Sequence, residues 1–223
     1  MIDETFCRYR VKISIDGPMA WLSHLDLLSA MERGLRRAAL PLRFSEGFNP
    51  HILIAFGPAH PVGLRSEGEY FDLDFREAPP ADWCARVNGV LPHGLRIEAA
   101  EKIPLQSKAL MAIIDIAEYQ ILLPGIDLGT CERACAAFLA LETCPIERHS
   151  PKGIKTVDIR PAVLALEANE KGLRLLCRIG VPGSPRPAEV LTAALPGVAS
   201  AGVIRTGLYI SDSNGAGHYN KIF

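Results

Sequence analysis

The segment from residue 41 to residue 57 decides the fold, and it reads Pro-Leu-Arg-Phe-Ser-Glu-Gly-Phe-Asn-Pro-His-Ile-Leu-Ile-Ala-Phe-Gly. Both ends have the composition of a strand. The middle does not, because Gly47 is free to take positive φ, and Asn49 with Pro50 favours a turn and removes a ladder N–H. The apolar ring of Phe48 stands among these turn residues. Two interpretations remain open: a binding loop that presents Phe48, or a bulge that redirects one long strand and folds Phe48 back inside.

The regions around this segment alternate between strand and helix patterns. Residues 7–15 alternate polar and apolar side chains, as a half-buried strand does. A helix follows to about Ala39, with Ser23 as its N-cap and Asp26 completing a capping box. The remaining elements of this half are a strand at 69–75, a short helix from 79 to 91 and a strand at 95–99. The order β-α-β-β-α-β is that of a ferredoxin-like unit.

The second half repeats this order. Its predicted elements are a strand at 109–123, a helix at 129–141, an extended segment at 145–159 broken at 150–153, a short helix or strand at 162–168, strands at 173–179 and 203–210, and a helix at 187–195. The breaks at 47–51 and 149–153 fall at corresponding places, so element order alone indicates a duplication. We therefore predict an α+β protein of two tandem ferredoxin-like (βαββαβ) units with antiparallel sheets, at residues 1–104 and 105–211, followed by a flexible tail at 212–223.

Composition excludes several classes of protein. The chain has 223 residues, 48% of them hydrophobic and 22% charged, which is typical of a soluble globular protein and not of a disordered one. Its formal net charge of −1 supplies no global attraction to nucleic acid or anionic membrane, so such binding needs a local basic patch. No apolar run approaches the ~20 residues that span a bilayer, and the N-terminus lacks signal-peptide features. We expect a cytoplasmic protein with no membrane contact.

The six cysteines do not form a recognised metal motif. Cys131 and Cys135 have the first spacing of the Cys-x3-Cys-x2-Cys run that holds a radical-SAM cluster, but Phe138 occupies the third position. No pair has Cys-x2-Cys spacing. We interpret these cysteines as small buried residues of a helix face and expect neither a metal nor a cofactor.

Weak catalytic candidates are His24, Asp26 and His51. A histidine can act as a general base that a carboxylate orients. However, His24 and Asp26 stand at the first and third helical positions, where Asp26 is accounted for by capping. The chain has no Gly-x-Ser-x-Gly elbow, His-Glu-x-x-His or Walker loop. The sequence therefore does not favour an enzyme built on a familiar motif.

A cationic group is predicted beside the loop at 47–51. Arginines on the polar side of the first helix and just after it, together with His51, suit a phosphate backbone and an unstacked base. The alternative is a solvated helix face balanced by Glu32 and Glu46. The predicted substrate-binding residues are Arg33, Arg36, Arg37, Arg43, Ser45, Gly47, Phe48, Asn49 and His51.

Several motifs resemble one bacterial family. They are Trp21-Leu-Ser-His-Leu-Asp-Leu27, Leu35-Arg-Arg-Ala38, Phe44-Ser-Glu-Gly-Phe-Asn-Pro-His51, Ser66-Glu-Gly-Glu-Tyr70, Val157-Asp-Ile-Arg-Pro161 and Ile204-Arg-Thr-Gly-Leu-Tyr-Ile210. This pattern is similar to the uncharacterised "radical SAM-linked protein" family and covers nearly the whole chain. The resemblance implies that the chain is encoded beside, or fused to, a radical-SAM protein, and it implies no reaction.

Together these features lead to one favoured function and two alternatives. The favoured one is an accessory binding module that presents RNA or another phosphate-bearing substrate to a radical-SAM partner. The first alternative is an RNA-processing or RNA-modifying enzyme that uses His24, Asp26 or His51. The second is a purely structural partner subunit.

Overall fold

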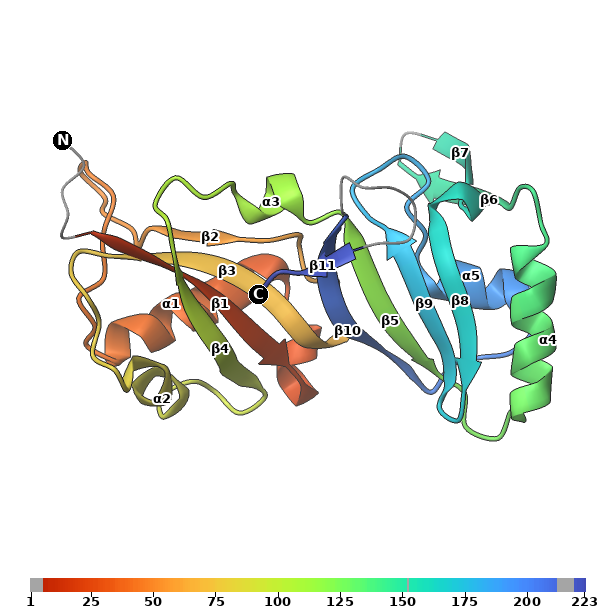
Figure 1. Ribbon diagram of the computed structural model, residues 1–223, viewed down its shortest axis with the longest axis horizontal. Helices are drawn as coiled ribbons and strands as arrows, with labels where there is room; N and C mark the ends of the chain where they lie inside the picture. The colour runs from red at the N-terminus through yellow and green to blue at the C-terminus, as the bar shows by residue number, and fades with distance from the viewer. Residues whose placement is uncertain (1–5, 152, 212–218) are drawn as a thin grey trace. The chain divides into compact units, whose positions relative to one another are not determined.

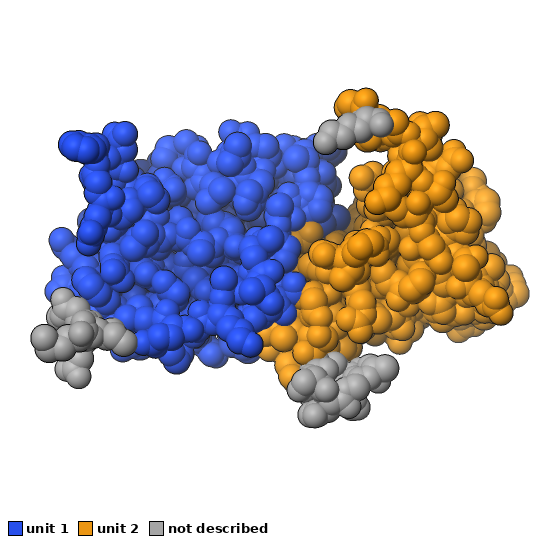
Figure 2. Space-filling view, turned by 90° about the horizontal axis from the view of Figure 1, so that it is seen from above, with its two compact units in different colours: residues 1–114, 223 blue, residues 115–222 orange. Residues whose placement is uncertain are grey.

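The computed structural model describes residues 6–151, 153–211 and 219–223. The chain divides into two compact units, one of residues 1–114 with residue 223 and one of residues 115–222 (Figure 2). Both combine a mostly antiparallel sheet with a few helices, so the predicted α+β class is confirmed.

The first unit has a sheet in the order β4-β1-β3-β2, in which every pairing is antiparallel (Figure 1). Three helices and a short 3-10 turn connect or flank these strands. The elements are β1 (Cys7–Ile15), η1 (Gly17–Trp21), α1 (His24–Arg37), β2 (Ile54–Phe56), β3 (Arg65–Phe75), α2 (Trp83–Asn88), β4 (Leu95–Ile103) and α3 (Leu110–Ile113).

One face of this sheet packs against α1 and α2. Strand alternation places Val11, Ile13 and Ile15 on that face, and all three are buried. Helix α1 buries Leu27, Met31 and Leu35 on the side that meets them, at the spacing of a single helical face. Edge-to-face contacts between Phe75, Trp83 and Tyr9 extend the same core. The predicted amphipathic helix and strand are both confirmed.

The other face of β1 and β3 carries cross-strand ion pairs. Arg10 lies directly opposite Asp72 in the register and binds it at 2.8 Å, and Arg8 binds Asp74 at 2.6 Å. Both guanidinium groups also donate to backbone carbonyls, Arg8 to Leu105 and Arg10 to Lys108. These bonds hold the segment after β4 across this face of the sheet.

The prediction of one long strand at 109–123 was wrong for residues 109–115. Residues 110–113 form α3, and β5 begins only at Ile116. Leu110, Ile113 and Ile114 recur at helical spacing, and Leu110 and Ile114 are buried. A short apolar run is compatible with a helix and with a strand. The contacts of α3 with β2 and β3 favour the helix here.

The second unit has a four-stranded antiparallel order, β10-β5-β9-β8, with β11 paired to β10. The strands β6 and β7 form a separate hairpin. The elements are β5 (Ile116–Leu122), α4 (Leu128–Leu139), β6 (Pro145–Ser150), β7 (Gly153–Asp158), η2 (Arg160–Ala162), β8 (Val163–Asn169), β9 (Gly172–Arg178), α5 (Pro187–Ala194), β10 (Gly202–Ser211) and β11 (Tyr219–Lys221). The ambiguous segment at 162–168 is mostly strand.

Two sequence predictions concern the end of the chain and the breaks. The tail predicted at 212–223 lies outside the described residues as far as 218, and Tyr219–Lys221 is strand β11. Both predicted breaks are hairpin turns that follow the first helix of their unit. Each hairpin thus lies between the first helix of its unit and the next strand of the sheet.

Candidate functional site

The predicted binding loop is the tip of a short hairpin, residues 43–53. An isolated bridge pairs Phe44 with Ile52, and the Leu53 N–H donates to the Arg43 carbonyl at 2.9 Å. Closer to the tip, the Ser45 N–H donates to the His51 carbonyl at 2.8 Å. Ile52 is fully buried and anchors the hairpin in the core. The tip, residues 46–50, is therefore held from both sides.

Hydrogen bonds between Ser45 and His51 close this hairpin below its tip. The Ser45 hydroxyl oxygen accepts the His51 backbone N–H at 3.1 Å and lies 2.8 Å from the His51 Nδ1 atom. Gly47 has φ +123°, a conformation that L side chains rarely adopt, so the predicted role of this glycine in the turn is confirmed. The sequence Ser-Glu-Gly-Phe-Asn-Pro-His thus builds a defined turn.

Phe48 projects from this turn into solvent. Its relative accessible area is 105%, so the interpretation that folds the ring into the core was wrong and the predicted exposure is confirmed. The sequence also predicted a cationic group, formed by arginines and His51, beside this loop. Among the described residues, the cation–π contacts involve other rings: Arg36 lies over Phe44 at 5.0 Å and Arg43 over Phe6 at 4.0 Å. Arg36 meets the base of the hairpin because Phe44, not Phe48, packs back toward α1.

The four predicted arginines occupy three separate places. Arg36 covers Phe44, as described above. Arg33 and Arg37 lie on α1 one turn apart and line a hollow with Val90 and Pro92, where the Arg37 Nη2 atom donates to the Val90 carbonyl at 2.8 Å. Arg43 lies 3.8 Å from Asp74. The sequence predicted one cluster because Arg33, Arg36 and Arg37 share the polar side of the helix and Arg43 follows soon after it.

The three helix arginines keep their charges unpaired within the described chain. No described carboxylate lies within 4.0 Å of Arg33, Arg36 or Arg37, including those of Glu32 and Glu46. Most other arginines, such as Arg8 and Arg174, are in ion pairs. The balanced helix face that the sequence left open as an alternative is therefore not formed by ion pairing. The C-terminal half of α1 presents a cationic surface.

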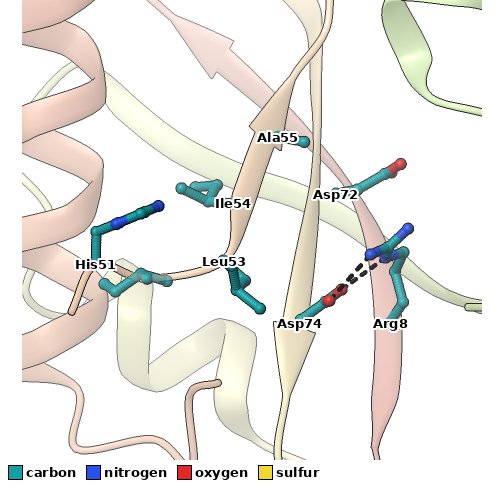
Figure 3. A pocket seen from close by; sticks show the side chains of 8 residues that line it. Arg8, His51, Leu53, Ile54, Ala55, Asp72 and Asp74 are labelled. Carbon is teal, nitrogen blue, oxygen red and sulfur yellow. Dashed lines mark hydrogen bonds and ion pairs between the residues drawn. The ribbon is translucent and has the colours of Figure 1, made fainter. Parts of the chain in front are cut away.

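A pocket of about 190 Å³ lies beside the base of the hairpin. Residues 51–55 form one wall, and Figure 3 shows Arg8 reaching the Asp74 carboxylate from the neighbouring strand, with Ile54 and Ala55 pointing to opposite sides of β2. The two aspartates at this pocket, Asp72 and Asp74, each bind an arginine. Arg8 and both aspartates are therefore paired, so none of these three residues brings an unpaired charge to the pocket.

The catalytic candidates occupy three different environments. The Ser23 oxygen accepts the Asp26 N–H at 3.2 Å, so Ser23 is confirmed as the N-cap. The Asp26 carboxylate accepts the Ser23 hydroxyl at 2.7 Å and not its backbone N–H, so the predicted capping box is not formed. The His24 ring packs edge-on against Phe56 at 5.8 Å. His51 binds Ser45 in the hairpin. No hydrogen bond joins His24, Asp26 and His51 to one another among the residues described.

Two buried polar clusters escaped the sequence analysis. In the first unit, Glu69 is buried, accepts the Ser66 hydroxyl at 2.6 Å and lies 3.6 Å from His60 Nδ1. The sequence did contain an indication that Glu69 is buried. Glu69, Phe71 and Leu73 alternate along one strand and so share a face, and the other two are apolar residues that face the core.

The second cluster surrounds Glu118 on the sheet of the second unit. Its carboxylate accepts the hydroxyls of Thr206 at 3.0 Å and Tyr209 at 2.9 Å, and it pairs with Arg174. Burial and the hydrogen bond to Glu118 raise the pKa of Tyr209 above its ordinary value. Gly207 is required here because a Cβ at this position would lie 2.7 Å from the Tyr209 hydroxyl. Glu118, Arg174, Thr206 and Tyr209 therefore each have a partner within the cluster, as in a structural network.

Five of the six cysteines are buried and Cys84 is half-buried. The prediction of a buried helix face is confirmed for Cys131 and Cys135, whereas Cys7 and Cys177 lie on strands. Cys131 and Cys135 lie on the buried side of α4, and burial raises the pKa of Cys135 to about 11. In residues 6–151, 153–211 and 219–223, no group of three or more His, Cys, Asp or Glu side chains is arranged to hold a metal ion. None of the helices in these ranges has the length and hydropathy needed to cross a membrane.

Comparison with known families gives one match. Residues 8–187 match the family described as "Uncharacterized protein conserved in bacteria (DUF2344)", and because this covers most of the chain, the protein belongs to that family. A search of curated proteins gave no significant match. The family description names no activity, and the radical-SAM link implied by the sequence motifs stays a prediction.

Proposed function

Starting from membership of this uncharacterised family, we propose that the protein is a non-catalytic binding module that presents RNA, or another phosphate-bearing substrate, to a radical-SAM partner. The observation that carries the proposal is the full exposure of Phe48 at the tip of a hairpin held by its own hydrogen bonds. Single exposed apolar side chains are common on protein surfaces, so the support comes from the combination of a fully exposed ring with a turn that hydrogen bonds hold in one conformation.

An unstacked base is the ligand that best fits this ring. Every nucleobase has a π face, and stacking on an aromatic side chain contributes ~1–3 kcal/mol without requiring a particular sequence. The hydrogen bonds between Ser45 and His51, together with the buried Ile52, hold the hairpin in one conformation before a ligand binds. Such preorganisation reduces the entropy lost on binding.

The cationic half of α1 supports the same ligand class. Arg36 covers Phe44 at the base of the hairpin and has no described carboxylate within 4.0 Å. A guanidinium group in this state can bind a phosphate oxygen without first releasing a protein carboxylate. Because the net charge of the chain is −1, the attraction would be local to this surface.

The radical-SAM partner enters the proposal through the sequence motifs alone. The likeness of the Trp21–Leu27 and Phe44–His51 motifs to the radical SAM-linked family motivates it, and the cysteine arrangement makes this chain the companion in such a pair. On the described residues, no observation favours the alternative of an enzyme that uses His24, Asp26 or His51.

We infer further that each unit is a ferredoxin-like fold. The first unit runs β-α-β-β-α-β with the sheet order β4-β1-β3-β2. The second unit has the same succession if the β6–β7 hairpin is treated as an insertion, and its order β10-β5-β9-β8 has the same form. Open antiparallel sheets with two helices are used for RNA recognition by other modules, which is an analogy of fold only.

The proposal is tested by measuring the affinity of the purified protein for a structured RNA such as tRNA over a salt series. Binding that weakens steeply with salt supports it, because phosphate contacts release counterions. Undetectable binding at low salt would remove RNA from the proposal. Co-purification of the radical-SAM chain with and without RNA tests the structural-subunit alternative, and product formation by this chain alone would point to an enzyme.

A further inference from the structure

A groove in the first unit, away from the Phe48 hairpin, was not predicted from the sequence. It consists of two adjoining hollows that share Pro92, and we call it the Pro92 groove. The first hollow, about 310 Å³, is lined by Ala30, Arg33, Arg37, Val90 and Pro92. The second, about 380 Å³, includes Ser14, Asp16, His93 and Arg96. Helix α1 and the segment between α2 and β4 therefore form its walls.

The first hollow is cationic. Arg33 and Arg37 stand four residues apart on α1, which places both side chains on the same side of the helix. Neither has a described carboxylate within 4.0 Å. Arg37 is oriented by its hydrogen bond to the Val90 carbonyl at 2.8 Å, and the Arg33 guanidinium makes no side-chain hydrogen bond to another described residue. Two unneutralised guanidinium groups at one hollow are suited to a phosphate.

The opposite wall is held rigidly in place. Leu91 packs so closely on Gly34 that a Cβ at that glycine would lie 2.5 Å from the leucine Cδ2 atom. Gly94 has φ +91°, and its carbonyl accepts the Asp16 N–H at 2.8 Å. These contacts fix both ends of the 91–94 segment, one against α1 and the other against the end of β1. The groove exists before any ligand binds.

The second hollow has a different chemistry. The Asp16 carboxylate there is paired with Arg65, and the Arg96 guanidinium lies 3.8 Å from Glu98. Its charges are thus balanced. The Ser14 hydroxyl donates to Glu98 at 2.5 Å, so its oxygen is left as an acceptor, and the exposed His93 adds a further polar group. Such a surface suits the hydroxyl groups of a sugar better than a second phosphate.

From these observations we propose that the Pro92 groove binds one nucleotide unit of a single-stranded RNA. Its phosphate lies between Arg33 and Arg37, and its ribose lies beyond Pro92 against Ser14 and Asp16. The inference rests on the proposed function for the identity of the chain as RNA, and it adds a backbone site separate from the base-stacking Phe48. No bond is made or broken at this site.

The test compares salt slopes for an oligonucleotide of eight uridines. Arg33→Gln removes one phosphate contact, so the slope of log K against log salt becomes shallower by about 0.7, the value for one contact to a single strand. Phe48→Ala lowers affinity and leaves the slope unchanged, because stacking releases no counterion. The matched control is Arg86→Gln, which removes the same charge from an exposed, Asp82-paired arginine that lines neither hollow.

Equal slopes for Arg33→Gln and Arg86→Gln would overturn the groove proposal while leaving the Phe48 hairpin untouched. A second measurement covers the case in which RNA does not bind at all. Inorganic pyrophosphate is titrated into ¹⁵N-labelled protein, and saturable shifts of the Val90 amide and the Arg37 Nε–H, absent in Arg33→Gln, support the phosphate site. Absence of these shifts in the unmodified protein rejects the site. Thermal unfolding of each variant confirms that it is folded.

Discussion

Replacing Gly94 by alanine tests the packing that forms the Pro92 groove. The residue has φ +91°, and a Cβ there would lie 2.3 Å from the backbone oxygen of Asp16. A backbone atom cannot move aside as the end of a flexible side chain can. Two costs follow: about 1–2 kcal/mol for a left-handed backbone with a side chain, and about 1–3 kcal/mol for overpacking. Gly17→Ala is the control, because Gly17 also has positive φ but would meet nothing within 4 Å.

The difference between these two variants isolates the contact with Asp16. Urea unfolding followed by circular dichroism should show Gly94→Ala to be less stable than Gly17→Ala by about 1–3 kcal/mol, since the backbone terms largely cancel. The oligonucleotide salt slope should also become shallower in Gly94→Ala, because the wall opposite Arg33 has moved. Equal stability of the two variants would refute the account of how this wall is held.

Three further predictions concern the core, the second unit and the thiols. Phe75→Ala should cost ~3–5 kcal/mol of unfolding free energy by urea titration, because Phe75 is fully buried against Tyr9 and Trp83, and a loss under about 1 kcal/mol would contradict this packing. Although burial alone would raise it, hydrogen bonds from Arg148 and the Arg186 N–H hold the pKa of Glu189 below its ordinary value of 4.5. The stabilisation by the Arg148–Glu189 pair is therefore complete above the unfolded-state pKa of Glu189 and is lost as the pH falls through its folded-state pKa. Arg148→Met should then lower the unfolding free energy, measured by urea titration, more at pH ~7 than at pH ~3. Equal losses of unfolding free energy at the two pH values would contradict this. Cys135, whose pKa burial raises to about 11, should react with iodoacetamide at pH ~8 far more slowly in the native protein than in urea, as mass spectrometry of the labelled peptide would report.

The sequence predicted those parts of the fold whose local pattern agrees with their tertiary environment. The alternation of residues 7–15 and the capped helix that begins after Ser23 both appear in the structure with nearly the expected bounds. For Phe48 the sequence left two interpretations open, and the structure has the exposed one, which its glycine, asparagine and proline neighbours favour. The strand, the helix start and this turn depend on local interactions, so a single sequence indicates them.

What the sequence did not predict depends on long-range contacts. The helical turn at Leu110 is set by packing on β2 and β3, which no local pattern specifies. The predicted arginine cluster divided because Phe44 attracts Arg36 while Asp74, far along the chain, attracts Arg43. The Pro92 groove combines residues from α1 and the segment before β4, which are distant in sequence. The spacing of residues along a helix predicts which of them share a face. It does not predict which other part of the chain that face contacts.

The most direct test of the central claim is the effect of Phe48→Ala on RNA affinity and on stability in the same preparation. We predict that affinity falls by ~1–3 kcal/mol, the range for loss of one stacked base, while the unfolding free energy changes by no more than about 0.5 kcal/mol, because the ring is fully exposed. Unchanged affinity in a variant of unchanged stability would contradict the claim that this hairpin binds RNA.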